Sequence, residues 1–392
     1  MTDGDSGLTG DWTYPTRFRF GAGRIAELAE ACAELGMKRP LLITDAGLAA
    51  LPMVAEAVKI CEEAGLGVGV FSDVKPNPTG GNVATGVDAY RSGNHDGVIA
   101  FGGGSGLDAG KAVAFMIAQD RPAWDFEDVG DNWTRANAEG LAPVVAVPTT
   151  AGTGSETGRA VVLLCEETAT KKIIFHPGMM PGIIIADPEL TLTLPPPLTA
   201  ATGMDALAHS FEAFAAPGFH PMADGIAVEA LRLIKEWLPV AYGDGQDLAA
   251  RAHMMAAASM GAVAFQKGLG AVHSLSHPVG ALYDTHHGLT NAVFLPYVCV
   301  FNRAAIEGKM ARLARSLALA EPSFDAVLDW LLRLRAELDI PPTAKDLGVE
   351  EGRLPELAEM AAKDPTAATN PVPAGPEEML SIYRAAFDGR LE

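Results

Sequence analysis

Cysteine is scarce in this sequence of 392 residues, and its four cysteines stand far apart. Cys32, Cys61, Cys165 and Cys299 form no CxxC pair, which argues against both a zinc knuckle and a disulfide framework. We therefore expect reduced, mostly buried thiols, as in a cytoplasmic protein.

Basic charge and long apolar runs are also lacking. The 29 Lys and Arg residues face 49 Asp and Glu residues, giving a net charge of −20. Nucleic-acid and anionic membrane surfaces require clustered basic side chains, so we expect neither partner. We find no apolar stretch of the roughly 18 residues that span a bilayer. The polar, acidic segment 1–11 is the opposite of a signal peptide, and we expect no secretory leader.

The first half of the sequence alternates short apolar runs with amphipathic segments. The apolar runs show no polar alternation, so both faces of each strand should be buried, which is typical of a parallel sheet with βαβ connections. We predict an α/β domain over residues 1–194. Its expected strands are 40–45, 68–74, 97–103, 143–150 and 182–187, and its expected helices are 23–36, 53–65, 82–92 and 106–118.

The pattern changes at residues 195–197, which are three consecutive prolines. Such a run cannot continue a helix or a central strand and therefore indicates a domain boundary. Beyond it almost all periodicity is helical, which predicts an all-α domain over residues 195–392. The expected helices are 199–216, 225–241, 248–265, 304–317, 324–338 and 377–387. A cleft between two such domains is a common place for a cofactor and substrate to meet.

Three segments could bind the phosphates of a dinucleotide. Residues 102–108 (GGGSGLD) follow a predicted strand and open a helix, so their backbone N–H groups could face an anion, although a plain strand-to-helix turn is the alternative. Residues 148–156 (PTTAGTGSE) also follow a strand and offer four hydroxyls. Residues 21–26 (GAGRIA) match a Rossmann fingerprint, but no full βαβ unit precedes them, and a tight turn explains them equally well.

Asp45 ends the predicted strand 40–45, where its carboxylate could accept a hydrogen bond from a ribose hydroxyl. A negative charge at that position would repel the 2′-phosphate of NADP. The sequence therefore favours NAD over NADP as the cofactor.

Histidines gather in one short part of the second half: four of the nine lie between positions 273 and 287. Asp205 and His209 stand four residues apart in a predicted helix, which puts both on one face, and His273 and His277 repeat this spacing. Three imidazoles and one carboxylate suit Fe(II) or Zn(II) better than Ca²⁺ or Mg²⁺. Spacing alone offers more candidates than four coordination places can use: Asp205, His209, His273, His277, His286 and His287.

These segments resemble motifs of the iron-containing (group III) alcohol dehydrogenase family, in family order and over nearly the full chain. The segments are 101–111, 148–156, 187–190, 203–209 and 273–291. The resemblance implies a dehydroquinate-synthase-like fold, with an N-terminal Rossmann-like dinucleotide-binding domain and a C-terminal all-α metal-binding domain. It also implies a homodimer or a larger homo-oligomer.

The resemblance further implies a role for individual residues. The metal ligands would be Asp205, His209, His273 and His287, binding Fe(II), with Zn(II) as the alternative. His277 would be an active-site histidine near the nicotinamide instead of a ligand. The NAD contacts would be Asp45, Asn77, Gly103, Gly104, Ser105, Thr149, Thr150, Thr153 and Lys171, with Asp108 at the start of the helix after the glycine loop. Two positions depart from the family pattern: His286, where proline is frequent, and Gly110, where alanine is usual.

The implied function is reversible hydride transfer between an alcohol and NAD⁺, giving an aldehyde or ketone and NADH. The metal would act as a Lewis acid on the substrate oxygen, and His277 could relay the proton. One alternative is a same-fold NAD- and metal-dependent enzyme acting on a hydroxy acid or polyol. Another is a dehydroquinate-synthase-like lyase, which would need several basic residues for its carboxylate and phosphate substrate. A non-enzymatic metal-binding or assembly protein is the third, but it would not require NAD loops.

Overall fold

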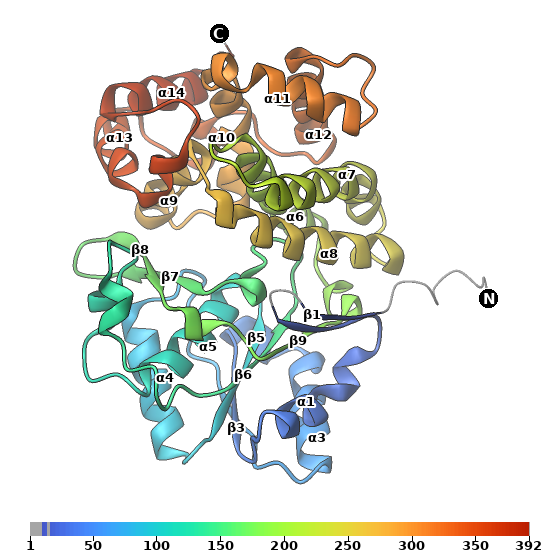
Figure 1. The fold of residues 1–392 in the computed structure, drawn as a ribbon, viewed down its shortest axis with the longest axis vertical. Coiled ribbons are helices and arrows are strands. Elements are labelled where there is room, and N and C mark those ends of the chain that lie inside the picture. Colours follow the sequence, from blue (N-terminus) through green and yellow to red (C-terminus); the bar gives the residue numbers. More distant parts are fainter. Residues whose placement is uncertain (1–9, 14–15, 392) are drawn as a thin grey trace, which may run out of the picture. The chain divides into compact units, whose positions relative to one another are not determined.

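The structure is a computed structural model that describes residues 10–13 and 16–391. Most of the segment 1–11, in which we expect no leader, lies outside these residues. The chain divides into two compact units (Figure 1). The first comprises residues up to Thr150 together with Gly154–Thr193, and the second comprises Ala151–Thr153 together with Leu194–Glu392. The sequence division after residue 194 had assigned Ala151–Thr153 to the first domain.

A seven-stranded sheet forms the centre of the first unit, in the order β1-β2-β9-β6-β5-β3-β4. All neighbouring strands pair in parallel except β1 and β2, which are antiparallel and were not predicted. The strands are β1 (Gly10–Thr13), β2 (Arg17–Phe20), β3 (Pro40–Ile43), β4 (Gly69–Phe71), β5 (Gly97–Gly102), β6 (Val144–Pro148) and β9 (Ile183–Ala186).

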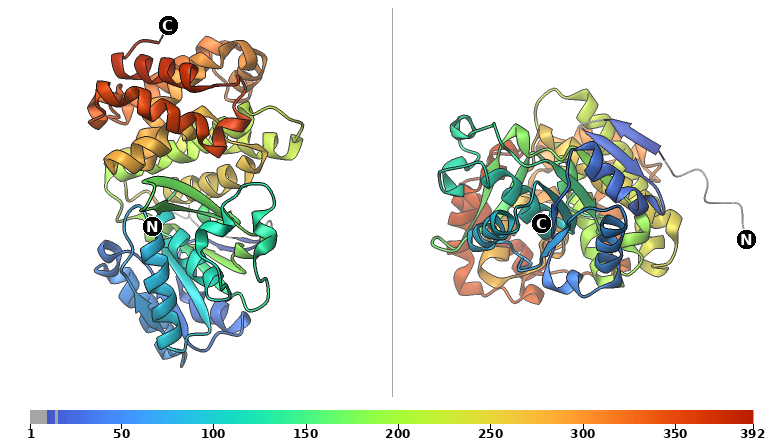
Figure 2. Two further views of the ribbon diagram at one scale, coloured as in Figure 1. Left: turned by 90° about the vertical axis from the view of Figure 1, so that its left-hand side faces the viewer. Right: turned by 90° about the horizontal axis from the view of Figure 1, so that it is seen from below.

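Helices lie on both sides of this sheet, with α1 and α3 on one side and α4 and α5 on the other (Figures 1 and 2). The α-helices of the unit are α1 (Leu28–Glu34), α2 (Ala46–Ala49), α3 (Pro52–Glu63), α4 (Gly80–Ser92) and α5 (Gly104–Met116). Short 3₁₀ turns complete it: η1 (Arg24–Glu27), η2 (Ala123–Phe126), η3 (Asn132–Arg135), η4 (Ser155–Thr157), η5 (Pro177–Met179) and η6 (Pro188–Thr191).

Strand β5 shows why this sheet is apolar throughout. Ile99 and Phe101 belong to the core cluster that α1 and α3 close on one face. On the other face, a Cβ added at Gly110 of α5 would lie 2.5 Å from the Cβ of Ala100. Gly110 therefore allows α5 to pack directly on the strand, so the departure from the usual alanine has a structural reason.

A two-stranded antiparallel hairpin, β7 (Ala160–Cys165) and β8 (Thr170–Phe175), stands apart from the main sheet and was also not predicted. Its buried and half-buried residues alternate along β7, as expected of a strand with one covered face. Because the sequence AVVLLC is apolar at every position, this alternation could not be read from hydrophobicity.

The second unit is helical. It contains α6 (Pro196–Ala215), α7 (Pro221–Gly243), α8 (Leu248–Ala264), α9 (Ala271–Tyr283), α10 (His287–Phe301), α11 (Arg303–Ser316), α12 (Phe324–Glu337), α13 (Leu354–Lys363) and α14 (Pro376–Asp388), with short turns η7 (Phe265–Lys267), η8 (Ala344–Leu347), η9 (Glu351–Arg353) and η10 (Pro365–Thr369). The three prolines 195–197 form the N-cap and first turn of α6. Proline suits this place because the first helical N–H groups have no partner within the helix.

One stretch of this unit, Leu248–Lys267, is long and apolar enough to cross a membrane, with 67% of its most apolar window buried inside the structure. The expectation that no apolar stretch reaches that length was therefore wrong here. Its burial is that of a core helix in a packed domain.

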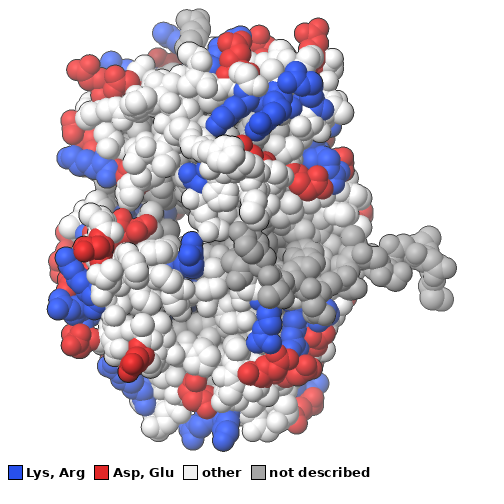
Figure 3. Space-filling model, viewed as in Figure 1, with Lys and Arg blue, Asp and Glu red and all other residues white. Residues whose placement is uncertain are grey.

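Charged side chains on the described surface are mixed in sign. On the face drawn in Figure 3, basic and acidic groups lie beside one another among uncharged residues. Arg232, for example, bonds to Glu229 and Glu236 on the same helix face. Such ion pairs neutralise part of the negative charge of the acidic side chains locally.

Candidate metal centre and cofactor loops

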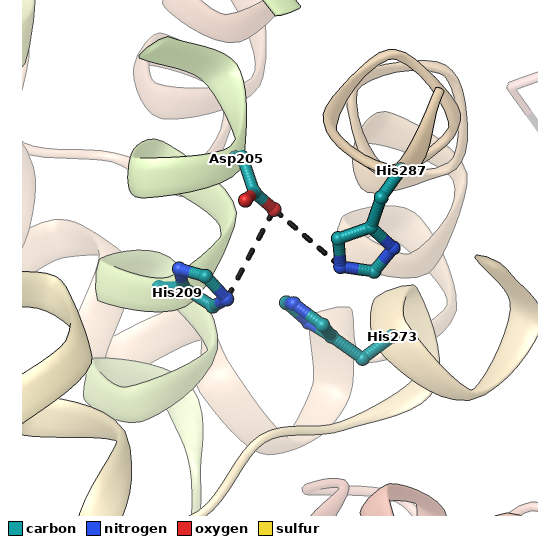
Figure 4. A group of neighbouring side chains, drawn as sticks. All are labelled: Asp205, His209, His273 and His287. Carbon is teal, nitrogen blue, oxygen red and sulfur yellow. Dashed lines mark ion pairs between the residues drawn. The ribbon is translucent and has the colours of Figure 1, made fainter. Parts of the chain in front are cut away.

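Three helices of the second unit direct four side chains toward one point (Figure 4). Asp205 and His209 come from α6, His273 from α9, and His287 from the first residue of α10. One potential ligand atom from each lies within 4.8 Å of the others. The side chains that the family resemblance singled out are therefore the ones that the structure brings together.

The separations allow all four ligand atoms to bind one ion. Oδ1 of Asp205 lies 3.9 Å from Nε2 of His209 and 3.6 Å from Nε2 of His287. Metal–ligand bonds of about 2.1 Å in a tetrahedron separate the ligand atoms by roughly 3.4 Å. Only small side-chain adjustments would be needed for these atoms to share one ion.

Asn291, one helical turn after His287, adds a further polar group at this point. Its Nδ2 lies 2.8 Å from Oδ1 of Asp205 and 3.2 Å from Nε2 of both His273 and His287. The amide has only two hydrogens for these three acceptors. Its own buried Oδ1 has no hydrogen-bond partner among the residues that the structure describes. The cluster thus holds more acceptor atoms than donors, a surplus that a divalent cation would satisfy.

The electrostatics of the imidazoles agree with this. Burial lowers the pKa of His209 to about 4, so its ring is neutral at pH 7 and keeps a lone pair for a ligand bond. Burial also acts to lower the pKa of His273, but the negative charges of Glu212, Asp205 and Asp364 outweigh it and raise the pKa. The carboxylates around the point where the four side chains meet therefore favour a positive charge there.

Two buried carboxylates that sequence analysis missed hold the histidines of α9. Glu212 accepts a hydrogen bond from Nδ1 of His273, and Oδ2 of Asp364 lies 2.7 Å from Nδ1 of His277. Burial alone would raise the pKa of Asp364, but His277 and the hydrogen bonds from Thr366 hold it below its usual range. Glu212 could have been found, because it continues the α6 face of Asp205 and His209; Asp364 offered no such signal.

The two adjacent histidines have different surroundings. His287 points into the cluster, and its ring stacks on that of His277 with centroids 5.5 Å apart. His286 is the N-cap of α10, where its Nδ1 accepts the N–H of Leu289 at 3.4 Å. The structure thus assigns His286 to the helix start and not to the cluster.

The predicted NAD residues of the first unit follow the carboxyl ends of parallel strands. Asp45 follows β3, and Gly103 follows β5; these strands are neighbours, although the chain visits β4 at the sheet edge between them. This is a topological switch point, where open α/β sheets bind their ligands. Oδ1 of Asp45 accepts the N–H of Leu48 at 2.9 Å, which also makes it the N-cap of α2.

The glycine loop after β5 combines a strained turn with close packing. Gly102 has a φ of 145°, which favours glycine, and a Cβ at Gly106 would lie 2.7 Å from the carbonyl oxygen of Phe101. Gly103 is the N-cap of α5, and none of the side chains that the structure describes caps the helix. Its first N–H groups at Gly104 and Ser105 can therefore face an anion.

Two predicted NAD contacts in this loop have other bonds. The hydroxyl of Ser105 donates to the carbonyl oxygen of Pro76. Asp108 accepts from the Ser155 hydroxyl with Oδ1 and from the N–H of Val162 with Oδ2. These two bonds hold the loop after β6 against α5, and the cofactor contact of Asp108 stays a prediction.

The remaining predicted NAD residues lie on three segments. Thr149 and Thr150 follow β6, and Thr153 belongs to the second unit. Lys171 on β8 pairs with Leu164, whose N–H donates to the carbonyl oxygen of Pro78 at 2.8 Å. Through this bond, β7 of the hairpin contacts the segment that contains Asn77.

The fingerprint at residues 21–26 is a tight turn. Gly23 has a φ of 74° and is the N-cap of η1. The N–H of Ile25 donates to Oδ2 of Asp187 at 2.9 Å. Because the carboxylate of Asp187 already occupies the start of η1, the segment fits a tight turn better than a phosphate-binding loop.

Comparison with known sequences decides the family. Residues 15–188 match the family model of iron-containing alcohol dehydrogenase, and residues 199–387 match that of the C-terminal part of the Fe-containing alcohol dehydrogenase family. The chain belongs to the iron-containing alcohol dehydrogenase family.

Individual members of this dehydrogenase family are similar over almost their whole length. The chain is 38% identical to 1,3-propanediol dehydrogenase of Citrobacter freundii, covering 96% of this chain and 98% of that protein. It is 39% identical to 4-hydroxybutyrate dehydrogenase of Cupriavidus necator, covering 91% and 94%. The crystal structure of a 1,3-propanediol oxidoreductase has a TM-score of 0.89 and 37% identity, covering 94% and 97%.

As an iron-containing alcohol dehydrogenase, the protein is an NAD-dependent oxidoreductase that acts on CH–OH groups with the help of a metal. The predicted fold class is confirmed, with a parallel Rossmann-like sheet in the first unit and helices in the second. The buried Asp and His cluster is chemically suited to the iron of this family. Because both family models describe dehydrogenases, the lyase and scaffold alternatives are set aside.

Proposed function

We propose that Asp205, His209, His273 and His287 hold one Fe(II), with Zn(II) as the alternative, at the catalytic centre of an alcohol dehydrogenase. The observation that carries the proposal is the meeting of these four ligand atoms within 4.8 Å in the interior of the second unit. Three imidazoles with one carboxylate form a ligand set that both ions accept.

When bound, the ion supplies Lewis acidity to an alcohol or carbonyl oxygen, and the nicotinamide accepts or gives the hydride. The residues of the chain supply binding, orientation and proton transfer. Because Asp364 accepts the proton of Nδ1, the ring of His277 is oriented with Nε2 as its exchanging atom. We assign His277 the relay of the alcohol proton through Nε2 to solvent.

For the cofactor, we propose that NAD binds at the switch point between β3 and β5. The pyrophosphate would lie against the N–H groups at the start of α5, near Gly103, Gly104 and Ser105. Thr149, Thr150 and Thr153 would add neutral donors, Asn77 and Lys171 would contact the cofactor from the segments after β4 and on β8, and Oδ2 of Asp45 would accept from the ribose. The start of α5, which lies at a parallel strand end and lacks a side-chain cap from the described residues, supports this placement.

Asp45→Ser is expected to weaken the preference for NAD over NADP. Serine can still cap α2, but the negative charge that repels a 2′-phosphate is gone. The ratio of kcat/KM for NAD to kcat/KM for NADP should fall at least about tenfold, which corresponds to about 1.4 kcal/mol. Steady-state kinetics with both cofactors measure this, and an unchanged ratio would remove Asp45 from the cofactor site.

The substrate class that we propose is a primary alcohol. The relatives named above carry the names of 1,3-propanediol and 4-hydroxybutyrate, and another, from Bacillus methanolicus, is named for methanol; all three compounds have a terminal carbinol. Metal-loaded protein mixed with NAD⁺ and a panel of short alcohols, diols and hydroxy acids should form NADH with at least one of them. An absence of NADH with the whole panel would count against the function.

We further propose a homodimer or larger homo-oligomer in the cytoplasm, without a nucleic-acid or membrane partner. The net charge of −20 supports the exclusion of anionic partners, and the four buried free cysteines suit a reducing compartment. Sedimentation of the purified protein would measure its assembly state.

A further inference from the structure

We propose that Glu212 sets the metal affinity of this centre by fixing His273, and that it links the centre to the start of α9. The inference rests on the proposed function, because it concerns the ion held by the same four side chains. Glu212 is a positioning residue: it contacts a ligand histidine and a backbone N–H, not the ion.

The position of Glu212 on α6 follows from helical spacing. Asp205, His209 and Glu212 stand at i, i+4 and i+7, which puts them on one face of the helix. All three are buried, with 2%, 5% and 4% exposure. The first two direct their side chains into the cluster, and Glu212 follows one turn later, beside the beginning of α9.

Both carboxylate oxygens of Glu212 are used there. Oε2 bonds to Nδ1 of His273, and Oε1 accepts the N–H of Val272 at 2.8 Å. Since the carboxylate accepts at His273, the proton of the imidazole is on Nδ1, and the lone pair is on Nε2. That lone pair faces the cluster, where Nε2 also lies 3.2 Å from Nδ2 of Asn291. Glu212 thus selects the tautomer of His273 that can bind a metal.

The chain is packed tightly around this carboxylate. A Cβ at Gly270 would lie 3.0 Å from Oε1 of Glu212 and 2.8 Å from Oδ1 of Asn370. Asn370 accepts the N–H of Ala271, so two side chains cap successive N–H groups of α9. Of these two caps, Glu212 is the one that also bonds a histidine of the cluster. Its removal should therefore change metal binding as well as helix stability.

Carboxylates that bond to a metal-binding histidine affect metal affinity in many proteins. A hydrogen-bonded carboxylate orients a ligating imidazole and raises its basicity, and loss of such a partner typically weakens metal binding 10- to 100-fold. Glu212→Gln keeps the shape but has one acceptor oxygen for two donors. Either the Val272 N–H or Nδ1 of His273 then faces an NH₂ group, and in both arrangements His273 loses its hydrogen bond to a charged carboxylate.

The matched control is Tyr383→Phe. The hydroxyl of Tyr383 donates to the carbonyl oxygen of Leu275 at 2.6 Å, so this variant also removes one buried hydrogen bond to α9, close to His273. It changes no group that bonds a cluster histidine. Both variants should lower the melting temperature, and only the Glu212 variant should change metal binding.

The test titrates Zn²⁺ into metal-depleted wild type, Glu212→Gln and Tyr383→Phe against a colorimetric chelator, and records the visible spectrum of each with Co²⁺. We expect the dissociation constant of Glu212→Gln to rise 10- to 100-fold, with an altered Co²⁺ spectrum, and Tyr383→Phe to match wild type in both. Wild-type affinity in Glu212→Gln, or an equal loss in Tyr383→Phe, overturns the inference.

Two further outcomes remain distinguishable. If wild type itself binds neither ion, the proposed function fails, and the role of Glu212 fails with it. If Glu212→Gln does not fold, Glu212→Asp serves as the second variant, since it keeps the charge but is one methylene shorter. It should again bind Zn²⁺ more weakly than Tyr383→Phe, and equal affinities would overturn the inference.

Discussion

Alanine in place of His287 is expected to abolish metal binding and alcohol oxidation together, whereas alanine in place of the adjacent His286 should leave both intact. Nε2 of His287 lies 3.6 Å from Oδ1 of Asp205, inside the cluster, while His286 accepts the N–H of Leu289 as a helix cap. Loss of one ligand in four removes a metal whose Lewis acidity contributes several kcal/mol, so turnover should fall about 10³-fold or more.

The two neighbouring variants control for each other. Metal per chain is measured after gel filtration without added metal, and NADH formation is measured with the best alcohol of the panel. The His286 variant should lose some helix stability but keep wild-type metal content. The reverse pattern, with metal lost at His286 and kept at His287, would assign the ligand to the other histidine.

Alanine in place of His277 should lower kcat by about 10²- to 10⁴-fold, the range expected for loss of a general acid–base group, while bound metal stays at the wild-type ratio. The ring stacks on that of His287 but bonds to Asp364, so its removal leaves the four ligand atoms in place. Because His277 acts on the proton and does not hold the metal, turnover and metal content should separate in this variant.

Asp364→Asn is the companion variant for this prediction. Its amide can present an NH₂ group to Nδ1 of His277 and thereby favour the other tautomer, so kcat should fall in the same direction with metal retained. Rates of NADH formation at saturating NAD⁺ and alcohol distinguish a loss of kcat from a loss of binding. Loss of the metal from either variant would mean that His277 belongs to the ligand shell.

The sequence predicted those parts of the fold whose signal is local. The parallel strands β3, β5, β6 and β9 were found because burial on both faces gives continuous apolar runs. Helices α9 and α10 were missed as elements because Pro278 and Pro296 interrupt them, and α10 is also buried almost all round, which weakens its amphipathic period.

For the candidate site, too, the sequence predicted what depends on local spacing and not what depends on distant contacts. Asp205 and His209 could be paired by their spacing, but the choice of His287 over His286 and His277 depended on the family resemblance. Asp364 lies 87 positions from His277, so only the packing of α9 against η10 brings the two together. The bonds of Asp108 to Ser155 and Val162 could not be predicted from the sequence either, because these partners lie 47 and 54 positions away.

The central claim is that a metal held by the Asp205, His209, His273 and His287 cluster is required for NAD-dependent alcohol oxidation. Its most direct test is NADH formation by one protein sample before chelation, after chelation and dialysis, and after addition of Fe(II). We expect activity to disappear with the metal and to return as bound iron approaches one per chain. Undiminished NADH formation by the metal-depleted protein would contradict the account.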